Sequence, residues 1–320
     1  MLQQISERIR QNQSFLIVAH ERPDGDAIGS ALAVYHLLRG LGKDAVVYNQ
    51  DNTPENFLFL PGSDVIVQEL PPVEDFDVAV ILDCGDLERV GSQAARIGTM
   101  RSFINIDHHI ANRGFSDVRL VDPDASSTGE LLFRLMRHMD LSLSRETASC
   151  LYAAILTDTG GFHYGNTRGA TLRTAAELVE AGAEPQWISE NIYESDHPGR
   201  MRLLGAALPT LSLEENGRIG SLVVTQKALA EAGARPEHAE GFVDFPRSIR
   251  GVEVSVLFSE LPDGRFKISL RSKGKTNVER VARVFGGGGH VNAAGCKIAG
   301  RLAEVRSRVL EAVRTYALET

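Results

Sequence analysis

Aspartate and histidine recur in short clusters across the first half of the chain, and each cluster follows an apolar segment. That segment is a run of β-prone residues or an apolar helix. In an open parallel sheet, ligands gather outside the carboxyl ends of the strands, so loops that follow several strands converge on one crevice. The spacing therefore predicts a largely parallel α/β sheet with one metal site at its edge. The clusters are His20 with Asp24 and Asp26, then Asp83, then Asp107-His108-His109, and finally Asp158.

Alternating apolar runs predict the strands and helices that carry these clusters. Residues 14–19 are typical of a buried strand and residues 27–39 of a helix that ends near Gly40, so residues 20–26 form a strand-to-helix loop. Further short strands are expected at Val46–Tyr48, Val65–Val67, Val78–Leu82 and Phe103–Ile106, and two helices at Thr128–Met139 and Arg145–Thr157. We therefore expect a catalytic, metal-binding domain over residues 1–190.

A change of pattern marks a second domain. Strands are expected at Ile219–Thr225, Val252–Glu260 and Phe266–Arg271, and the residues Leu261-Pro262-Asp263-Gly264 between the last two form a strong turn signal. An amphipathic helix from about Leu302 to Leu318 closes the chain. These elements predict a smaller, mixed-sheet α/β domain at residues 213–320, after a linker at residues 191–212.

Composition narrows the class of protein. At 320 residues and 43% hydrophobic, the chain exceeds the usual single domain of about 100–200 residues, which favours two domains. The first residues carry no apolar signal region and no stretch approaches the roughly 18 apolar residues of a membrane span, so we expect a cytoplasmic protein without a membrane partner. Three scattered cysteines favour neither a disulfide framework nor a thiolate zinc site. The net charge of -8 disfavours long duplex nucleic acid and favours a small anionic substrate.

The loop from His20 to Asp26 has the design of a metal-binding loop. Pro23 and Gly25 define a sharp turn that projects one imidazole and two carboxylates. A calcium EF-hand is excluded, because counting from Asp24 places Tyr35 at the twelfth position, where that motif needs glutamate. A surface turn with solvated acids explains this loop, taken alone, about equally well.

The other clusters differ in how specifically they indicate a metal site. Asp83 directly follows a buried strand, and alone it would equally suit a helix N-cap. Two adjacent histidines beside Asp107 are more telling, because this arrangement is uncommon outside metal or acid–base sites. Asp158 precedes Thr159 and two glycines, which let the backbone turn close to a ligand.

The number of acids indicates how many metal ions the site holds. Four ionised carboxylates, those of Asp24, Asp26, Asp83 and Asp158, cannot share one crevice without compensation, and two divalent cations would balance them. With His20 and His108 added, two mixed oxygen and nitrogen sites can be drawn, bridged by Asp83. Imidazole ligands favour manganese, iron or cobalt over magnesium, and manganese is our first choice. Such a centre suits phosphoester hydrolysis, because two ions can activate a shared water and stabilise phosphoryl oxygens.

The second domain adds a basic, glycine-rich segment. Seven basic residues between positions 265 and 283 are accompanied by one acid, Glu279, in a chain of net charge -8. Gly286 to Gly289 precede what we expect to be a new helix, where backbone N–H groups would face an anion. We interpret the segment as a local phosphate-facing patch, and the alternative is a solvated face with a flexible linker. The basic residues are Arg265, Lys267, Arg271, Lys273, Lys275, Arg280 and Arg283.

Taken together, these motifs resemble those of the DHH phosphoesterases that carry a DHH-associated C-terminal domain. The resemblance covers most of the chain through five ordered motifs: residues 20–30, Ile81-Leu-Asp83, Asp107-His-His109, Thr157-Asp-Thr-Gly160 and Gly286-Gly-Gly-Gly-His290. The compact two-domain length is most similar to the bacterial nanoRNase and pAp phosphatase branch. The resemblance implies an active-site cleft between the domains. It also implies a manganese-dependent hydrolase of very short oligoribonucleotides, a few nucleotides long, and of adenosine 3',5'-bisphosphate (pAp).

The resemblance also implies roles for individual residues. His20, Asp24 and Asp83 would hold one manganese ion, and Asp26, Asp83, His108 and Asp158 the other. His109 would polarise the scissile phosphate, with Asp107 orienting an imidazole. A homodimer is a further expectation from the family. The substrate would be held in the second domain by Arg271, Ser272, Gly287, Gly288, Gly289 and His290.

Other functions remain open at this point. A manganese pyrophosphatase or polyphosphatase shares the metal motifs, although the glycine-rich segment argues against it. Cleavage of cyclic dinucleotides is a further alternative, and a long-strand exonuclease is disfavoured by the charge. A nucleotide-binding regulator without catalysis would be expected to lack a ligand, whereas every candidate ligand is present here.

Overall fold

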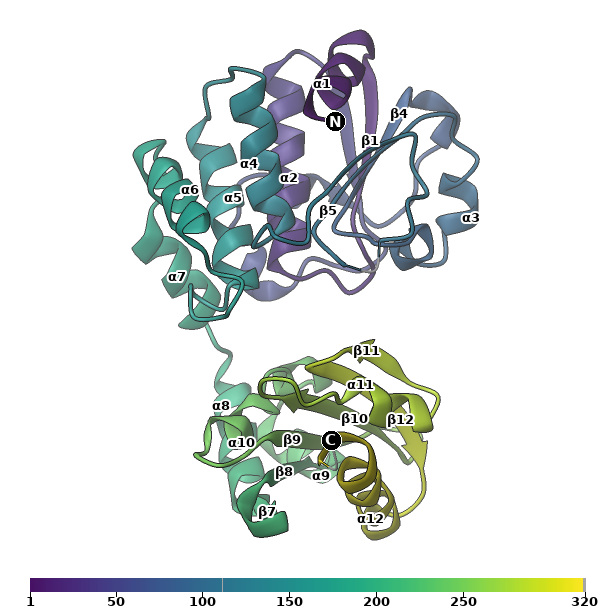
Figure 1. The fold of residues 1–320 in the computed structure, drawn as a ribbon, viewed down its shortest axis with the longest axis vertical. Helices are drawn as coiled ribbons and strands as arrows, with labels where there is room; N and C mark the ends of the chain where they lie inside the picture. Colours follow the sequence, from purple (N-terminus) through teal and green to yellow (C-terminus); the bar gives the residue numbers. More distant parts are fainter. Residues whose placement is uncertain (111, 319–320) are drawn as a thin grey trace. The chain divides into compact units, whose positions relative to one another are not determined.

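The first sheet has six parallel strands and carries the acid and histidine clusters at its edge. The structure is a computed structural model that describes residues 1–110 and 112–318, and its chain forms two units, Met1–Ser195 and Asp196–Thr320 (Figure 1). In the first unit the strand order is β3-β2-β1-β4-β5-β6, and every neighbouring pair is parallel, which confirms the predicted parallel sheet. The strands are β1 (Ser14–Val18), β2 (Asp44–Tyr48), β3 (Ile66–Val67), β4 (Val78–Leu82), β5 (Phe103–Asp107) and β6 (Val118–Val121).

Helices of unequal length cover the two faces of this sheet. The long helices α2, α4 and α5 lie together on one face, whereas α3 and short helical turns cover the other (Figure 1). The central strands are apolar on both faces, as expected for a parallel sheet between two helical layers. The helices of this unit are α1 (Leu2–Gln11), α2 (Gly25–Gly40), α3 (Ala94–Ile97), α4 (Thr128–His138), α5 (Arg145–Asp158), α6 (Gly169–Glu180) and α7 (Pro185–Tyr193).

Close packing of α2 on α5 joins two clusters that lie far apart in the sequence. Gly25 opens α2, and a Cβ atom at this position would lie only 2.4 Å from the Thr157 hydroxyl oxygen near the end of α5. Only glycine permits this approach. The start of α2, with Asp24 and Asp26, therefore lies beside the end of α5, with Asp158.

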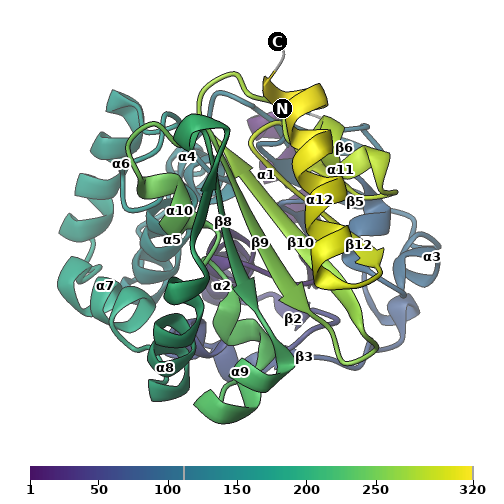
Figure 2. The same ribbon diagram turned by 90° about the horizontal axis from the view of Figure 1, so that it is seen from below.

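The second unit is smaller than the first and has a mixed sheet, as expected. Its order is β11-β12-β10-β9-β8-β7, in which β8 and β9 are parallel and the other pairs are antiparallel. Helices α11 and α12 cover one face, and α8 and α9 pack against the other (Figure 2). Its strands are β7 (Ser212–Glu214), β8 (Ile219–Val224), β9 (Val254–Glu260), β10 (Arg265–Ser272), β11 (Gly288–His290) and β12 (Ala293–Ala299). Its helices are α8 (Pro198–Ala207), α9 (Gln226–Ala232), α10 (Asp244–Ser248), α11 (Glu279–Val284) and α12 (Leu302–Val313).

Three further expectations can be compared with these elements. The segment at residues 191–212, expected as a linker, contains helix α8 and belongs in large part to the second unit. The three cysteines are buried and unpaired. Among the described residues, every helix is too short or too polar to traverse a bilayer.

The predicted helix after the glycine run is wrong. Gly286 and Gly287 follow α11, and the chain then forms the hairpin of β11 and β12, in which Gly289 pairs with Ala294. A Cβ atom at Gly287 would lie 2.2 Å from the Gly295 carbonyl oxygen, and one at Gly289 would lie 2.4 Å from that of Ala293. These glycines therefore allow one strand to lie closely against the next. A run of glycines that serves this packing cannot be distinguished in the sequence from the glycine run of a phosphate-binding loop.

Candidate metal centre

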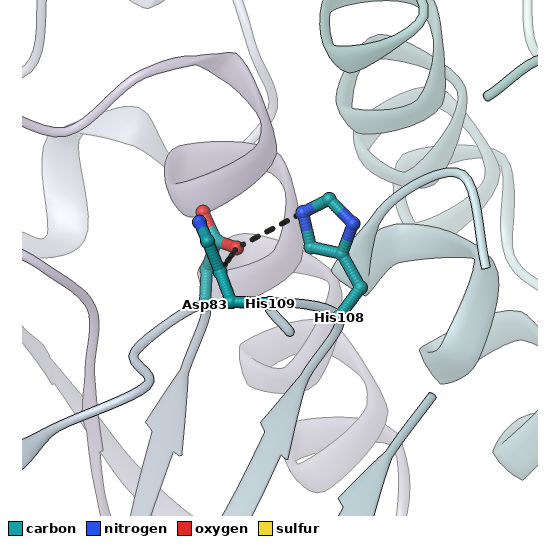
Figure 3. Close-up of side chains that lie close together, drawn as sticks. All are labelled: Asp83, His108 and His109. Carbon is teal, nitrogen blue, oxygen red and sulfur yellow. Dashed lines mark ion pairs between the residues drawn. The ribbon is translucent and has the colours of Figure 1, made fainter. Parts of the chain in front are cut away.

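The predicted ligands meet at the carboxyl ends of β1, β4 and β5. Asp83 lies at the centre: its Oδ2 atom is 3.4 Å from His20 Nε2, and its Oδ1 atom is 3.6 Å from His108 Nε2. Figure 3 shows Asp83 at the end of one strand and His108 and His109 at the end of the next, with dashed lines that join both imidazoles to the Asp83 carboxylate. His108 Nε2 also lies 3.6 Å from Asp158 Oδ2 and 3.8 Å from Asp26 Oδ2.

Among the described residues, three groups of side chains have the spacing of metal ligands: one is Asp83, His108 and His109, and the other two share no residue with each other. In each group the ligand atoms lie within 4.8 Å of one another. Because Asp83 directs one carboxylate oxygen toward His20 and the other toward His108, it stands in the position of a bridge between these other two groups. The first group is His20, Asp24 and Asp83, and the second is Asp26, His108 and Asp158.

The backbone of Asp83 adopts the left-handed conformation, with φ of 56°. This region is costly for most residues other than glycine, asparagine and aspartate, and such outliers cluster at functional sites. The Asp83 N–H donates to the Ile106 carbonyl at 3.0 Å, and the Thr128 hydroxyl donates to Asp83 Oδ1 at 3.1 Å. Both contacts fix the direction of the carboxylate, and no pattern in the sequence indicates the role of Thr128.

His20 has a defined tautomer. Its Nδ1 lies 2.8 Å from the Glu21 carbonyl oxygen, which can only accept, so Nδ1 carries a proton. The remaining nitrogen, Nε2, faces Asp83 and Asp24. A ring held in this way by a backbone carbonyl is the usual arrangement of a metal-binding histidine.

Asp26 connects α2 to α4. This buried carboxylate accepts from the backbone N–H groups of Thr128 at 2.7 Å and Gly129 at 3.0 Å, and from the Ser30 hydroxyl at 3.0 Å. The first N–H groups of a helix have no partner within the helix, so an acid placed there is stabilised. The Ser127 cap of α4 is a signal visible in the sequence, but it does not reveal that Asp26 is a second cap.

Asp107 orients His109 and is itself held by asparagines. Asp107 Oδ1 lies 2.7 Å from His109 Nδ1, and Asp107 Oδ2 accepts from the Asn112 amide at 2.7 Å. Asn112 also donates to Asn105 at 2.8 Å. The imidazole that Asp107 contacts is therefore that of His109, and its role in orienting this ring stays a prediction. Neither asparagine was identified from the sequence.

Asn166 supports the last ligand. Its amide donates to the carbonyl oxygens of Asp158 at 3.0 Å and Ser126 at 2.9 Å, and lies 3.4 Å from Asp158 Oδ2. This contact joins the loop after α5 to the segment before α4. No spacing rule in the sequence indicated Asn166 as a partner of Asp158.

The clustered carboxylates of the centre need positive charge to compensate them. Burial and the charges of Asp83 and Asp158 raise the pKa of Asp26 well above its ordinary value, although the Thr128 N–H opposes this. Burial disfavours a charged His20, but Asp24 and Asp83 outweigh it and raise the pKa of His20 to about 10. Clustered acids that hold protons this tightly fit a site built for divalent cations, which would replace those protons.

Metal binding by the metal-free protein is expected to weaken as the pH falls through about 7. Burial, with the charges of Asp83 and Asp24, outweighs the His108 imidazole and raises the pKa of Asp158 from 3.8 to about 7. Below that pH an ion must displace the Asp158 proton in addition to that of His20, and each displaced proton lowers the apparent affinity about tenfold per pH unit. Calorimetric titration with manganese on both sides of pH 7 measures this slope.

The same shift predicts the stability of the metal-free fold. Because the folded pKa of Asp158 lies above its ordinary value, its proton stabilises the fold fully below pH 3.8, and this contribution is lost as the pH rises through about 7. The variant Asp158→Asn is the control, since a plot of its free energy of unfolding against pH should no longer change slope near pH 7. If the variant keeps the same change of slope as the wild-type protein, Asp158 is excluded as the titrating ligand.

The predicted substrate residues occupy the end of β10, strand β11 and the position directly before β11. Arg271 pairs with Ala293, which in turn pairs with His290, so these backbone positions form one row across the sheet. The Ser272 hydroxyl donates to the Thr276 carbonyl within the turn after β10. A Cβ atom at Gly288 would meet no other atom within 4 Å, so this glycine has open space beside it. The side chain of His290 lies outside the described part of the chain.

The basic patch is partly neutralised. Arg265 pairs with Asp263, and Arg283 pairs with Glu279. Lys273 donates to the Ile249 carbonyl at 3.2 Å. The predicted surplus of positive charge in this segment is therefore smaller than the count of basic residues indicates.

Comparison with known proteins adds independent findings. The DHH family, N-terminal domain, matches residues 14–155, and the DHHA1 domain matches residues 220–319. NrnA of Thermus thermophilus, a bifunctional oligoribonuclease and PAP phosphatase, is 36% identical over 302 residues, covering 93% of this chain and 88% of the relative. The Bacillus subtilis protein of the same name is 28% identical and covers 89% of each chain. The crystal structure of an exopolyphosphatase-related protein from Bacteroides fragilis has a TM-score of 0.95 at 31% identity, over 98% of this chain and 96% of that one.

Proposed function

The chain belongs to the DHH family of phosphoester hydrolases, and from that membership we propose that it is a two-metal enzyme acting on very short nucleotides. Its substrates would be oligoribonucleotides of a few residues, cleaved to mononucleotides, and adenosine 3',5'-bisphosphate. One observation carries the two-metal part: the two oxygens of Asp83 face two separate ligand groups, through His20 and His108. The names of the Thermus and Bacillus relatives support the substrates.

The ligand assignment follows the two groups. His20, Asp24 and Asp83 would hold one ion, and Asp26, Asp83, His108 and Asp158 the other. Manganese is our proposed metal, because the groups mix imidazole and carboxylate ligands. When bound, two such ions supply Lewis acid activation of a water molecule and of the phosphoryl oxygens.

His109 would act on the substrate rather than on a metal ion. Burial disfavours its charged form, but the hydrogen bond with Asp107 and the Asp83 charge outweigh this and raise the pKa of His109. A protonated His109 can donate to a phosphoryl oxygen and polarise the phosphate. Asp107, whose pKa is held low by His109 and Asn112 in spite of its burial, would stabilise that imidazolium.

The second unit would supply the remaining substrate contacts. We assign these contacts to Arg271, Ser272, His290 and the glycines at positions 287–289. Arginine suits this role because its planar fork matches the oxygens of a phosphate. A substrate with few phosphates is also consistent with the net charge of -8, since binding to a long strand depends on many neutralised phosphates.

Product release from four substrates in parallel tests the proposal. Protein stripped with a chelator and reloaded with manganese is offered pAp, a 5'-phosphorylated diribonucleotide, a long RNA and pyrophosphate. We expect turnover of pAp and the diribonucleotide, measured as released phosphate and mononucleotide. Faster cleavage of the long RNA or of pyrophosphate would overturn the substrate assignment, and binding without turnover would favour a regulator.

A polyphosphatase is the second candidate. It is favoured by the similarity to the exopolyphosphatase-related protein from Bacteroides fragilis, whose 31% identity extends over nearly the whole chain. Tripolyphosphate and a cyclic dinucleotide are therefore added as further substrates. A higher kcat/KM for tripolyphosphate than for pAp would support this candidate against the nucleotide phosphoesterase.

A further inference from the structure

Two exposed tyrosines flank the glycine pair that follows the ligand Asp158. Tyr164 is 45% exposed and lies in the loop after α5, and Tyr193 is 51% exposed and ends α7. Exposure of single aromatic side chains is ordinary, so the informative feature is that both tyrosines approach the same glycine pair. The position of both rings beside a metal-ligand loop makes them candidates for contact with a substrate.

The face of the Tyr164 ring lies against Gly160. A Cβ atom at Gly160 would lie 2.4 Å from Cζ, 2.6 Å from Cε2 and 2.7 Å from Cε1 of that ring. Such similar distances to three ring atoms, with the hydroxyl oxygen not among the nearest, place Gly160 over the face of the ring and not at its edge. Gly160 has φ of 58°, so both its conformation and this contact favour glycine. Only a glycine backbone lets the ring lie this close to the end of α5.

Hydrogen bonds hold the loop that presents Tyr164. The Tyr164 N–H donates to the Thr159 carbonyl at 2.9 Å, and the Thr167 N–H donates to the Tyr164 carbonyl at 3.0 Å. Asn166, two residues beyond Tyr164, donates to the Asp158 carbonyl at 3.0 Å. The loop therefore couples the position of the ring directly to that of the ligand.

Tyr193 lies near the second glycine of the pair, Gly161. Its hydroxyl donates to the Leu156 carbonyl at 3.4 Å and would lie 3.9 Å from a Cβ atom at Gly161. The hydroxyl is thus used by the protein, while half of the side chain remains exposed. A ring fixed in this way loses little conformational entropy when a planar group binds to it.

We propose that Tyr164, with Tyr193 beside it, forms a stacking subsite for a nucleobase of the substrate next to Asp158. This inference rests on the proposed nucleotide phosphoesterase function. A substrate of one or a few nucleotides offers few phosphates, so contacts with its bases have to supply much of its affinity in a chain of net charge -8. Stacking on an aromatic ring suits any base, because every base has a flat π-face.

A base-free substrate isolates this contribution. The ratio of kcat/KM for pAp to kcat/KM for ribose 3,5-bisphosphate is measured in wild-type protein, Tyr164→Ala and Tyr164→Phe. In Tyr164→Ala the ratio should fall about tenfold or more, the scale of one lost stacking contact, whereas Tyr164→Phe should keep it within about twofold. Tyr316→Ala is the matched control, since this tyrosine is 44% exposed and lies in the second unit. An unchanged ratio in Tyr164→Ala would overturn the subsite, and an equal loss in Tyr164→Phe would assign the effect to the hydroxyl.

A binding measurement separates this inference from the proposed function. Calorimetry with adenosine 5'-monophosphate and ribose 5-phosphate, in the presence of manganese, needs no turnover. If wild-type protein hydrolyses none of the substrates, the proposed function fails, yet the subsite is still decided by these affinities. Tighter binding of the nucleotide that is lost in Tyr164→Ala supports the subsite. Equal affinities for the two ligands in wild-type protein would overturn it.

Discussion

Replacing Asp83 with asparagine is expected to lower kcat by more than about a thousandfold while the protein stays folded, on the scale of removing a group needed in the transition state. Asparagine has the size of aspartate and tolerates the left-handed backbone that φ of 56° requires. It lacks the charge that faces His20 and His108. Metal content by elemental analysis should fall together with kcat, because both proposed metal sites lose the carboxylate that they share.

Asp140→Asn is the matched control for this variant. Asp140 has the same φ of 56° but is exposed and lies in the turn after α4, outside both ligand groups. It should keep full activity and metal content. Turnover of Asp83→Asn within tenfold of wild type would exclude Asp83 as the bridging ligand, and a loss of its cooperative unfolding transition would assign it a structural role instead.

His109→Asn is expected to lower kcat by about 10²- to 10⁴-fold, the usual contribution of a positioned proton donor. The asparagine amide can donate to Asp107 in place of Nδ1, while the rest of the imidazole ring is absent. Metal content should be preserved, because His109 Nδ1 lies 2.7 Å from Asp107 and is committed to that hydrogen bond. Activity and bound manganese are measured on the same samples.

This variant also decides between two roles for His109. The geometry alone would allow a group of Asp83, His108 and His109 to hold an ion. If manganese is lost in proportion to activity, His109 is a ligand and the proposed role in polarising the phosphate is wrong. His138→Asn is the control, since His138 is exposed on α4 and its Nε2 lies 3.3 Å from Gln3 Oε1.

The family and the general location of the centre could both be predicted from the sequence. The resemblance to the DHH family is confirmed by two family matches and by a relative with 36% identity. His20, Asp83 and His108 each follow a buried strand, and parallel strands place their carboxyl ends at one edge. The prediction that these side chains converge needed only local patterns and this rule.

Residues that support the ligands were not predictable in the same way. Thr128 donates to Asp26 across 102 positions of sequence, and Asn112 and Asn166 are ordinary loop residues until the chain is folded. The expected helix after Gly289 is absent from the described part of the chain for a related reason. These glycines pack closely against β12, and this contact is not visible in the local sequence. In each case the partner is set by packing between elements that no local pattern describes.

The sequence by itself determined which residues are candidates to carry the chemistry and which ends of the strands hold them, because side-chain type and the period of apolar residues are local properties. The tertiary structure alone decided that Asp83 faces two ligand groups, that Asp26 also caps α4, and that Tyr164 rests on Gly160. These relations depend on the close approach of α2 to α5 and on the order of the strands. They arise from burial of apolar surface over the whole unit, to which every element contributes.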